Sequence, residues 1–517
     1  MEGMHMDNDQ TPPNGNTPYA AALAGVIAGL FMVAILRRQL GYWVGLPEGY
    51  RRFETFVVNQ LSYTPRIRYM TLPPVGVWLG VVLLLCVGLP LLLVDTNLKL
   101  NSNRAGFLSL ALVPFILATT GKHSALGCLT GMSPVQLNAI HRLLATAIVV
   151  TATTHMAYHI QSWVPFKSFL KVQLATEKVK YGLAGYGCLC VVFLGSMYPV
   201  RRFCYEILLG THLLAFGFIG AIAKHTPYAM RYFLTGLVLY GLNILAGWYV
   251  KSRIARVRLE PLANSTRLAI RTSSPIFHKP GQHLYIHIPS ISWFEWHPFT
   301  ITSTHLASDG SCDCIEIYAA NRGNFTRKLL NRAPAELFAF ISGPCGDAQS
   351  LEHDTIVSLN AGAGVTYGIR LLREALQDSS AAQRVFFAWS VRSASELTWF
   401  RRELDQVTNE FPNKVTVDLF VSDSSFDDLE EKVQETYHDK SEPSSSSSSA
   451  AGQQSKVATV HRRRLDIRSY LTEKIGLGDV GVYACGPAYY NAEVKNVVAS
   501  MSSPTHAPSL HCEAFEY

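Results

Sequence analysis

The chain has 517 residues, of which 48% are hydrophobic and only 16% are charged, and this length allows several domains. The net charge of +7 comes from basic clusters that flank apolar segments and not from one basic stripe, which excludes a nucleic-acid-binding protein. The ten cysteines are scattered without a pair of CxxC motifs, which argues against a zinc site. We therefore place the soluble part of the chain in a reducing cytosol.

Seven apolar stretches in the first half are long enough, or nearly long enough, to cross a bilayer. The first seventeen residues are polar and lack a basic region, so we expect a retained first span and not a cleaved signal peptide. Basic clusters follow the first and seventh stretches and precede the sixth, which places the N-terminus outside and the C-terminus in the cytosol. The loop with Lys167, Lys171, Lys178 and Lys180 then lies outside. The stretches are 19–36, 75–95, 106–121, 138–160, 181–199, 205–223 and 229–250.

The chain from Lys251 onward reads as a soluble module. Short alternating runs predict a small antiparallel barrel up to about Gly346, and a later alternation of strands and helices is typical of a parallel α/β sheet. An acidic and then serine-rich segment, 423–456, cannot bury enough apolar surface to fold and is predicted to be a disordered insertion. The expected parts are an extracytosolic tail (1–17), a seven-span membrane domain (18–250), a barrel domain (251–350) and an α/β domain (351–517).

Two pairs of histidines lie in or beside apolar stretches. His141 and His155 are fourteen residues apart, and His212 and His225 are thirteen apart. At ~1.5 Å per residue, each pair spans ~20 Å along a helix, which suits one histidine near each leaflet of a ~30 Å hydrocarbon core. Both stretches are expected to cross the membrane from the cytosolic side to the outer side. The first histidine of each, His141 and His212, should therefore share the inner leaflet and form one pair, and His155 and His225 should form the outer pair. Two neutral imidazoles on one iron give a six-coordinate haem suited to electron transfer.

Histidines in a membrane span are functional candidates by default, although a single one can instead join two helices by a hydrogen bond. Two pairs at matching spacings weaken that alternative. His159 lies one turn beyond His155 and remains an alternative outer ligand. His123, in a loop, has no helical partner, and we expect no specific role for it.

Two motifs in the soluble half suit a flavin. In HPFTITS (297–303), a strand would place the hydroxyls of Thr300 and Thr302 on one face, where they can hydrogen-bond a flavin. An edge strand that contains proline is the alternative. In GNFT (323–326), a glycine and a hydroxyl at a helix N-terminus suit a pyrophosphate, and an ordinary capped helix is the alternative.

Further motifs suit a nicotinamide nucleotide. AGAGVT (361–366) follows an apolar strand and opens a helix, a context in which glycines let the backbone approach a dinucleotide phosphate. Ser390 and Arg392 end the next strand and can hold a 2′-phosphate, which favours NADPH over NADH; a surface arginine is the alternative. Cys485, in VYACGP, ends a later strand at the edge where open α/β sheets bind ligands. Phe515 either covers a flavin ring or belongs to a packed tail.

Taken in this order, the motifs resemble the ferric reductase and NADPH oxidase superfamily, and more specifically the fungal-type ferric-chelate reductases, from about residue 106 to residue 517. The resemblance implies a multi-pass helical domain with a bis-haem bundle, followed by a ferredoxin-reductase-like module with a β-barrel FAD domain and an α/β NADPH domain. It also implies Thr300, Cys485 and Phe515 as candidate catalytic residues. The cofactor-binding residues that it implies are His297, Pro298, Phe299, Thr300, Thr302, Gly323, Thr326, Gly362, Gly364, Thr366, Cys485, Gly486 and Pro487.

The sequence departs from the family pattern in three places. GPCG (343–346) stands where the family often has GPYG, AGAG stands where it often has GGTG, and no EF-hand loop precedes the membrane domain. An aromatic contact to the flavin is therefore not expected at Cys345, the phosphate contacts are less defined, and a calcium-regulated oxidase is not expected.

The resemblance implies a plasma-membrane enzyme that moves electrons from cytosolic NADPH through FAD and two haems b to extracytosolic ferric or cupric chelates. Ferric chelates or siderophores are the expected acceptors, membrane lipid surrounds the spans, and an iron permease or multicopper oxidase acts in the same pathway. Two alternatives stay open: a superoxide-producing NADPH oxidase, and a non-enzymatic transporter or receptor with a degenerate module. The intact motif order argues against the latter.

Overall fold

The computed structural model divides into two compact units, which are residues 1–45 with 77–246 and residues 46–76 with 247–517. It describes residues 15–67, 70–121, 124–262, 264–293, 295–303, 311–346, 349, 351–377, 381–422, 458–476 and 478–514. The predicted disordered insertion, His123 and Phe515 lie outside these residues.

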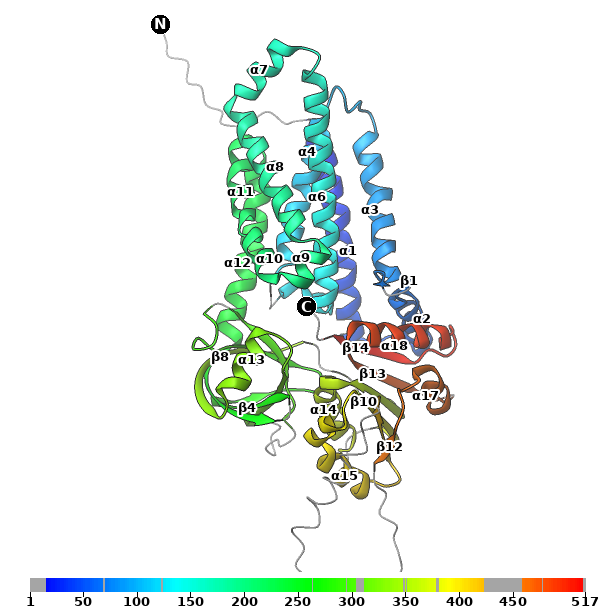
Figure 1. Cartoon of the computed structure of the whole chain (residues 1–517). Coiled ribbons are helices and arrows are strands. Elements are labelled where there is room, and N and C mark those ends of the chain that lie inside the picture. The colour runs from blue at the N-terminus through cyan, green and yellow to red at the C-terminus, as the bar shows by residue number, and fades with distance from the viewer. Residues whose placement is uncertain are drawn as a thin grey trace, which may run out of the picture. The chain divides into compact units, whose positions relative to one another are not determined.

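The first unit is a bundle of helices (Figure 1). Many of its apolar side chains are exposed on the outside of the bundle, as expected for helices that face lipid. Its core contains Leu23, Phe107, Leu112, Ile148 and Phe233. The helices are α1 Thr17–Trp43, α3 Val75–Leu93, α4 Asn103–Ala118, α5 Ala125–Thr130, α6 Pro134–Trp163, α7 Lys167–Ala175, α8 Glu177–Gly195, α9 Tyr198–Phe203, α10 Tyr205–His212, α11 Leu214–His225 and α12 Ala229–Lys251.

Five described segments are long and apolar enough to cross a membrane: α1, α3, α6, α8 and the run Tyr205–His225, while α4 and Ala229–Leu245 are shorter apolar helices. These match the seven stretches predicted from the sequence in position. The sixth stretch is interrupted at Leu213, where α10 ends and α11 begins. The start of α6 is explained by Ser133, whose hydroxyl accepts from the backbone N–H of Gln136 while the Gln136 side chain accepts from Ser133 N–H.

The barrel of the second unit is a six-stranded antiparallel sheet in the order β6-β5-β8-β3-β4-β7. Alternate side chains fill its interior, among them Val257, Leu268, Ile286, Ile315 and Ile341. Helix α13 (Asn324–Arg332) packs against it through Phe325 and Leu329. The strands are β3 Ser252–Leu262, β4 Ser265–Phe277, β5 His283–His287, β6 His297–Thr300, β7 Ser311–Ala320 and β8 Ala335–Cys345.

The nucleotide domain of the second unit is a six-stranded parallel sheet in the order β12-β11-β10-β9-β13-β14. Because all its strands are parallel, their carboxyl ends lie at one edge, where such sheets bind ligands. Its strands are β9 Thr355–Ala361, β10 Arg384–Val391, β11 Val415–Val421, β12 Thr459–His461, β13 Val480–Gly486 and β14 Ser509–Ala514. Its helices are η1 Gly362–Gly364, α14 Val365–Ala375, η2 Ala394–Trp399, α15 Arg401–Glu410, α17 Ile467–Lys474 and α18 Ala488–Met501.

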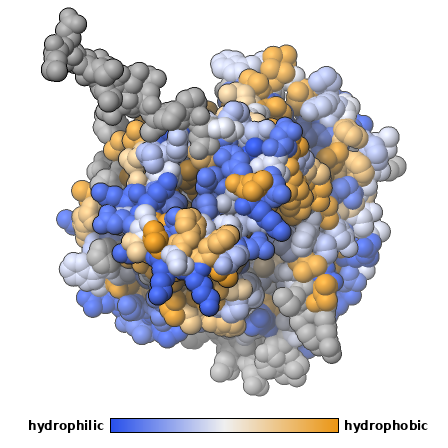
Figure 2. All heavy atoms as spheres, turned by 90° about the horizontal axis from the view of Figure 1, so that it is seen from above, coloured by the Kyte–Doolittle hydropathy of each residue, from blue (hydrophilic) through white to orange (hydrophobic). Residues whose placement is uncertain are grey.

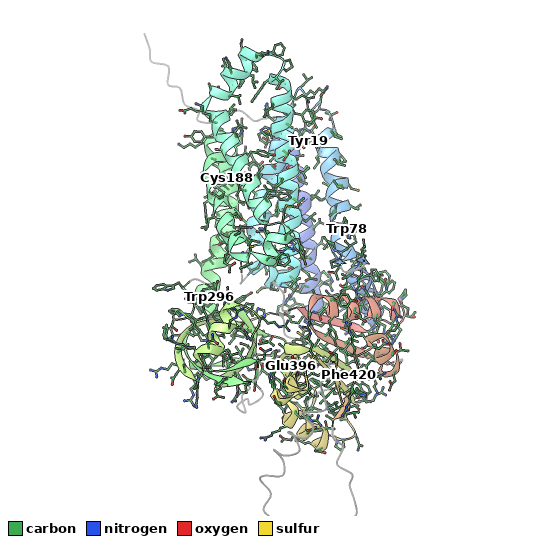
Figure 3. All side chains as sticks on the ribbon, in the orientation of Figure 1. Tyr19, Trp78, Cys188, Trp296, Glu396 and Phe420 are labelled. Atoms are coloured by element: carbon green, nitrogen blue, oxygen red, sulfur yellow. The ribbon has the colours of Figure 1, made fainter. Side chains whose placement is uncertain are left out.

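The chain re-enters this sheet after the insertion through β12, which is fixed by a buried carboxylate on β11. Asp418 accepts from His461 Nε2 at 2.9 Å and from the Tyr470 hydroxyl at 3.0 Å. The His461 ring also stacks on Phe420, with ring centroids 4.6 Å apart (Phe420 is labelled in Figure 3). The insertion therefore leaves and rejoins an ordered sheet.

One segment between the first two spans belongs to the second unit. It contains helix α2 (Glu48–Ser62) and the short strands β1 (Arg66–Ile67) and β2 (Met70–Thr71). Helix α2 lies against α18 of the nucleotide domain (Figure 1). This helix was not predicted from the sequence, in which the segment stands out only by its basic residues.

Candidate functional site

The four predicted haem ligands lie on three helices of the first unit. His141 and His155 are on α6, His212 is the last residue of α10, and His225 is the last residue of α11. All four side chains are half-buried.

Each of these histidines is oriented by a backbone carbonyl. The Nδ1 atoms lie 3.2 Å from Ile116 O for His141, 2.9 Å from Ser102 O for His155, 3.0 Å from Leu208 O for His212 and 2.7 Å from Lys178 O for His225. Because a carbonyl only accepts, each Nδ1 carries the hydrogen and each Nε2 has a free lone pair. Among the described residues, no Nε2 of the four has a hydrogen-bond partner. This is the arrangement that a neutral axial ligand requires.

The two outer histidines face each other. The ring centroids of His155 and His225 are 6.2 Å apart at an interplanar angle of 73°, which leaves room for one metal atom bonded at ~2 Å to each ring. His159 is engaged elsewhere, since its Nε2 lies 3.2 Å from Asn103 Oδ1 and its ring packs on Trp163. These contacts favour His155 over His159 as the outer ligand.

Two glycines that the sequence analysis did not single out make room for the outer pair. A Cβ added at Gly106 on α4 would lie 3.1 Å from His155 Nδ1, and one added at Gly182 on α8 would lie 2.7 Å from His225 Nδ1. Helices α4 and α8 can therefore approach the two imidazoles only because these positions lack a side chain. In the sequence, the signal for this close approach is that Gly106 and Gly182 each lie within an apolar span.

The described residues hold no group of three or more His, Cys, Asp or Glu side chains placed to bind a metal ion. A haem needs only two axial ligands from the protein, because its porphyrin supplies the other four. Two facing imidazoles are the protein ligands that a six-coordinate haem would require.

A buried arginine, not predicted from the sequence, lies two residues from Ser102, whose carbonyl accepts from His155 Nδ1. Arg104 on α4 is 3% exposed. It donates to Asn16 Oδ1 at 2.8 Å and to Leu91 O at 2.9 Å, and its guanidinium lies 3.3 Å from the ring centroid of Tyr19 (labelled in Figure 3). These partners satisfy a charge that would otherwise be costly in this position.

The flavin motif HPFT forms strand β6, as predicted, and the strand ends at Thr300. Thr300 is 9% exposed, whereas Thr302 lies beyond the strand, is 2% exposed and donates its hydroxyl to Thr300 O at 3.4 Å. The His297 ring stacks on Phe325 of α13 with centroids 3.9 Å apart, and Pro298 and Phe299 beside it are half-buried. The stacking of His297 on Phe325 thus brings β6 into contact with the N-terminal turn of α13.

That turn is built by GNFT. The Thr326 hydroxyl accepts from the backbone N–H groups of Arg322 and Gly323, both at 3.0 Å. Thr326 therefore orders the turn, and the space around Gly323 is open, with no atom within 4 Å of an added Cβ. An anion at this helix start would meet backbone N–H groups.

At Cys345, where the family often has tyrosine, the side chain is 4% exposed and its Sγ donates to Ser342 O at 3.7 Å. It is a small core residue of the barrel.

The two glycine motifs of the nucleotide domain pack on each other at the carboxyl edge of the sheet. A Cβ at Gly364 would overlap the carbonyl oxygen of Cys485, and one at Gly486 would lie 2.9 Å from the Cβ of Ala361. Gly362 has φ +55°, a conformation that favours glycine. Pro487 caps α18, and the Thr366 hydroxyl is buried and donates to Ala363 O at 2.9 Å. These residues therefore shape the loop by packing.

Residues around this loop supply charge. The Trp389 indole donates to Gly362 O at 2.9 Å, and Arg322 lies 3.5 Å from a Cβ added at Gly362. Burial raises the pKa of Glu396 (labelled in Figure 3), while Arg322 and Arg392 oppose that shift. Arg392 is exposed and Ser390 half-buried at the end of β10. Arg322 and Glu396 were not identified from the sequence because they lie far from the motif along the chain.

Cys485 is fully buried, and its Sγ donates to Glu513 O at 3.5 Å. Burial, with Glu513 and Cys512 nearby, raises the pKa of this thiol well above its ordinary value. It is therefore a neutral thiol at pH 7.

Three family profiles match consecutive parts of the chain. They are described as "Ferric reductase like transmembrane component" for residues 105–223, "FAD-binding domain" for 250–348 and "Ferric reductase NAD binding domain" for 353–499. Part by part, the chain is therefore similar to the membrane, FAD-binding and NAD-binding components of ferric reductases. The predicted fold, a helical membrane region followed by a barrel FAD domain and a nicotinamide-nucleotide domain, is confirmed.

Curated relatives agree with this assignment. "Probable cell surface ferric reductase kap2" of Aspergillus oryzae is 26% identical over 62% of this chain and 47% of its own length. "Ferric/cupric reductase transmembrane component 2" of Schizosaccharomyces pombe is 23% identical over 61% and 65%. "NADPH oxidase 1" of Mus musculus is 26% identical over 36% and 33%. The chain thus spans less than two thirds of the length of these relatives.

Proposed function

We propose that this membrane protein transfers electrons from cytosolic NADPH, through FAD and two haems b, to ferric or cupric chelates on the other side of the membrane, in support of iron uptake. The observation that carries the proposal is the set of four histidines whose Nδ1 atoms are held by carbonyls and whose Nε2 atoms have no hydrogen-bond partner among the described residues. Bound FAD would supply the change from hydride transfer to one-electron transfer, and haem iron would supply one-electron carriers.

The residues of the chain bind and orient these groups. His141 with His212 would hold one haem and His155 with His225 the other, with the carbonyl bonds fixing the imidazole planes. His297, Phe299 and Thr300 would line the flavin site, and the open N-terminal turn at Gly323 would accept its pyrophosphate.

NADPH is favoured over NADH by the charges at the end of β10. Arg392 and Ser390 would contact a 2′-phosphate, and Arg322 adds a second positive charge beside the glycine loop.

Lysines on the first unit favour anionic ferric chelates or siderophores as acceptors. Lys167, Lys171, Lys178 and Lys180 are all exposed. The view from above shows hydrophilic residues, with hydrophobic ones between them, over the end of this unit that carries α7 (Figure 2). The positive charge of these four lysines should raise the encounter rate of anionic acceptors, and high salt should remove this effect. An iron permease or multicopper oxidase is the partner that we propose for uptake, at the plasma membrane.

The second candidate is a superoxide-producing oxidase, favoured by the similarity to the mouse NADPH oxidase. Membranes that contain the protein would be assayed with NADPH and a ferric chelate, with and without oxygen. Equal ferrous production without oxygen supports direct metal reduction. Reduction that disappears without oxygen, or with superoxide dismutase, supports the oxidase.

The haem assignment has its own test. His155→Ala or His225→Ala should abolish reduction of the external acceptor while NADPH still bleaches the flavin absorbance. External reduction at the normal rate in either variant would contradict the assignment.

A further inference from the structure

Helix α2 binds the nucleotide domain through polar residues of its last turn and through the segment that follows it. Asn59, 1% exposed, donates to Ser502 Oγ and to Pro508 O, both at 2.9 Å. Gln60 Nε2 donates to Ala499 O at 2.8 Å. A chain segment more than 400 residues away in sequence is thus fixed to the end of α18.

Two further contacts extend this attachment along α18. The backbone N–H of Thr64 donates to Asn496 Oδ1 at 2.7 Å, and Asn496 Nδ2 donates to Thr64 O at 2.9 Å. Arg66 lies over the ring of Tyr489 at 4.3 Å from the centroid and donates to Tyr489 O at 3.2 Å. The attachment therefore covers α18 from its first turn, which follows the CGP motif, to its last.

The other side of α2 is apolar and open. Tyr50, Phe53 and Val57 are spaced three and four residues apart and so form one stripe. Tyr50 is 47% exposed and Phe53 is 51% exposed. Asn59 follows Tyr50 by nine residues, about two and a half turns, which places it on the opposite side of the helix.

Both ends of α2 are held at the ends of membrane spans. Residues 44–47 join it to α1, a link that reaches no further than roughly 18 Å when fully extended. At the other end, Tyr63 O accepts from the backbone N–H of Val75 at 2.9 Å, and Val75 is the first residue of α3. The chain connections at both ends therefore keep α2 within a short distance of span termini.

We propose that α2 lies in the lipid headgroup region of the leaflet where α1 ends. Its apolar stripe, in the first turns, is immersed in lipid, and Asn59 and Gln60 in its last turn clasp the nucleotide domain. An amphipathic helix with tyrosine and phenylalanine on one side suits this interface, and the exposed Arg51 suits anionic lipid. The helix would tether the nucleotide domain to the membrane independently of the α12–β3 connection. The inference rests on the spans being in a membrane and not on the electron acceptor.

The test uses the full-length protein in lipid nanodiscs that contain phosphatidylserine. The photoreactive residue p-benzoylphenylalanine replaces Phe53 in one variant and Arg52 in the matched control, which lies one residue away but about 100° around the helix. After illumination, mass spectrometry measures phospholipid adducts on α2. The flavin and haem spectra confirm that each variant is folded.

We expect lipid adducts at position 53 at least fivefold above those at position 52. Equal yields, or adducts at position 53 with protein alone, would overturn the lipid contact. The clasp is tested by hydrogen exchange in Asn59→Ala, for which we expect faster exchange in α18 than in the wild type and unchanged exchange in α14. Unchanged exchange in α18 would overturn the clasp. Ferric reduction does not enter either readout, so failure of the proposed function would be seen separately.

Discussion

Gly182→Ala should eliminate the outer haem while the protein stays folded. The added Cβ would lie 2.7 Å from His225 Nδ1 and 2.8 Å from its Cε1, and ordinary contact begins at 3.4 Å. The imidazole therefore has to move by about 0.7 Å, which is a third of a ~2 Å metal–nitrogen bond. That movement also stretches the 2.7 Å hydrogen bond from His225 Nδ1 to Lys178 O.

The energetic cost has two parts. Overpacking of this kind costs about 1–3 kcal/mol, and loss of one hydrogen bond costs about 0.5–1.5 kcal/mol. Together these cost about 1.5–4.5 kcal/mol and reduce outer-haem affinity by roughly ten- to a thousandfold, since each 1.4 kcal/mol is about tenfold. The inner pair, on His141 and His212, is not touched by Gly182.

The assay is the haem content of purified protein, by the pyridine haemochromogen method, together with a redox titration of the reduced-haem band. The variant should hold about half the wild-type haem and titrate as one component. Gly187→Ala is the matched control on the same helix, because no atom lies within 4 Å of an added Cβ there. Wild-type haem content and potentials in Gly182→Ala would refute the reasoning, as would equal haem loss in both variants. Gly106→Ala, at 3.1 Å from His155 Nδ1, should show a milder effect.

Three further predictions concern the second unit. Arg392→Ala should raise the KM for NADPH about 10- to 100-fold, the cost of a charged hydrogen bond, and leave the KM for NADH unchanged; steady-state flavin reduction measures both. Gly364→Ala should lower the Tm of the intact protein by several degrees, because its Cβ overlaps the backbone oxygen of Cys485. Burial and the charge of Arg370 lower the pKa of His278 to about 4. The unfolded chain therefore takes up a proton at this residue between pH 6.5 and 4 that the folded one does not, and stability falls by about 2 kcal/mol by pH 5. His278→Leu should make the decline of Tm between pH 7 and 5 shallower, and an unchanged slope would contradict this account.

The sequence by itself indicated the apolar stretches and the order of the barrel and nucleotide domains, and it singled out four histidines as candidate haem ligands. These features follow from local patterns. An apolar run has to be long enough to cross a bilayer, and the fixed rise per residue of a helix converts the spacing of two histidines into a distance. Strand β6 was predicted too long, since alternation continues past Thr300 in the sequence although the ladder to β5 ends there.

Only the tertiary structure decided how the histidines are oriented and what leaves room for them. The carbonyls of Ile116, Ser102 and Lys178 come from turns and helices 25 to 53 residues away from the ligands they hold. The role of Gly182 exists only because α8 and α11 pack closely. Helix α2 has a weakly apolar sequence of its own, and its place follows from partners more than 400 residues away. Such contacts depend on how helices and strands pack against one another, and packing is not encoded in the periodicity of any single segment.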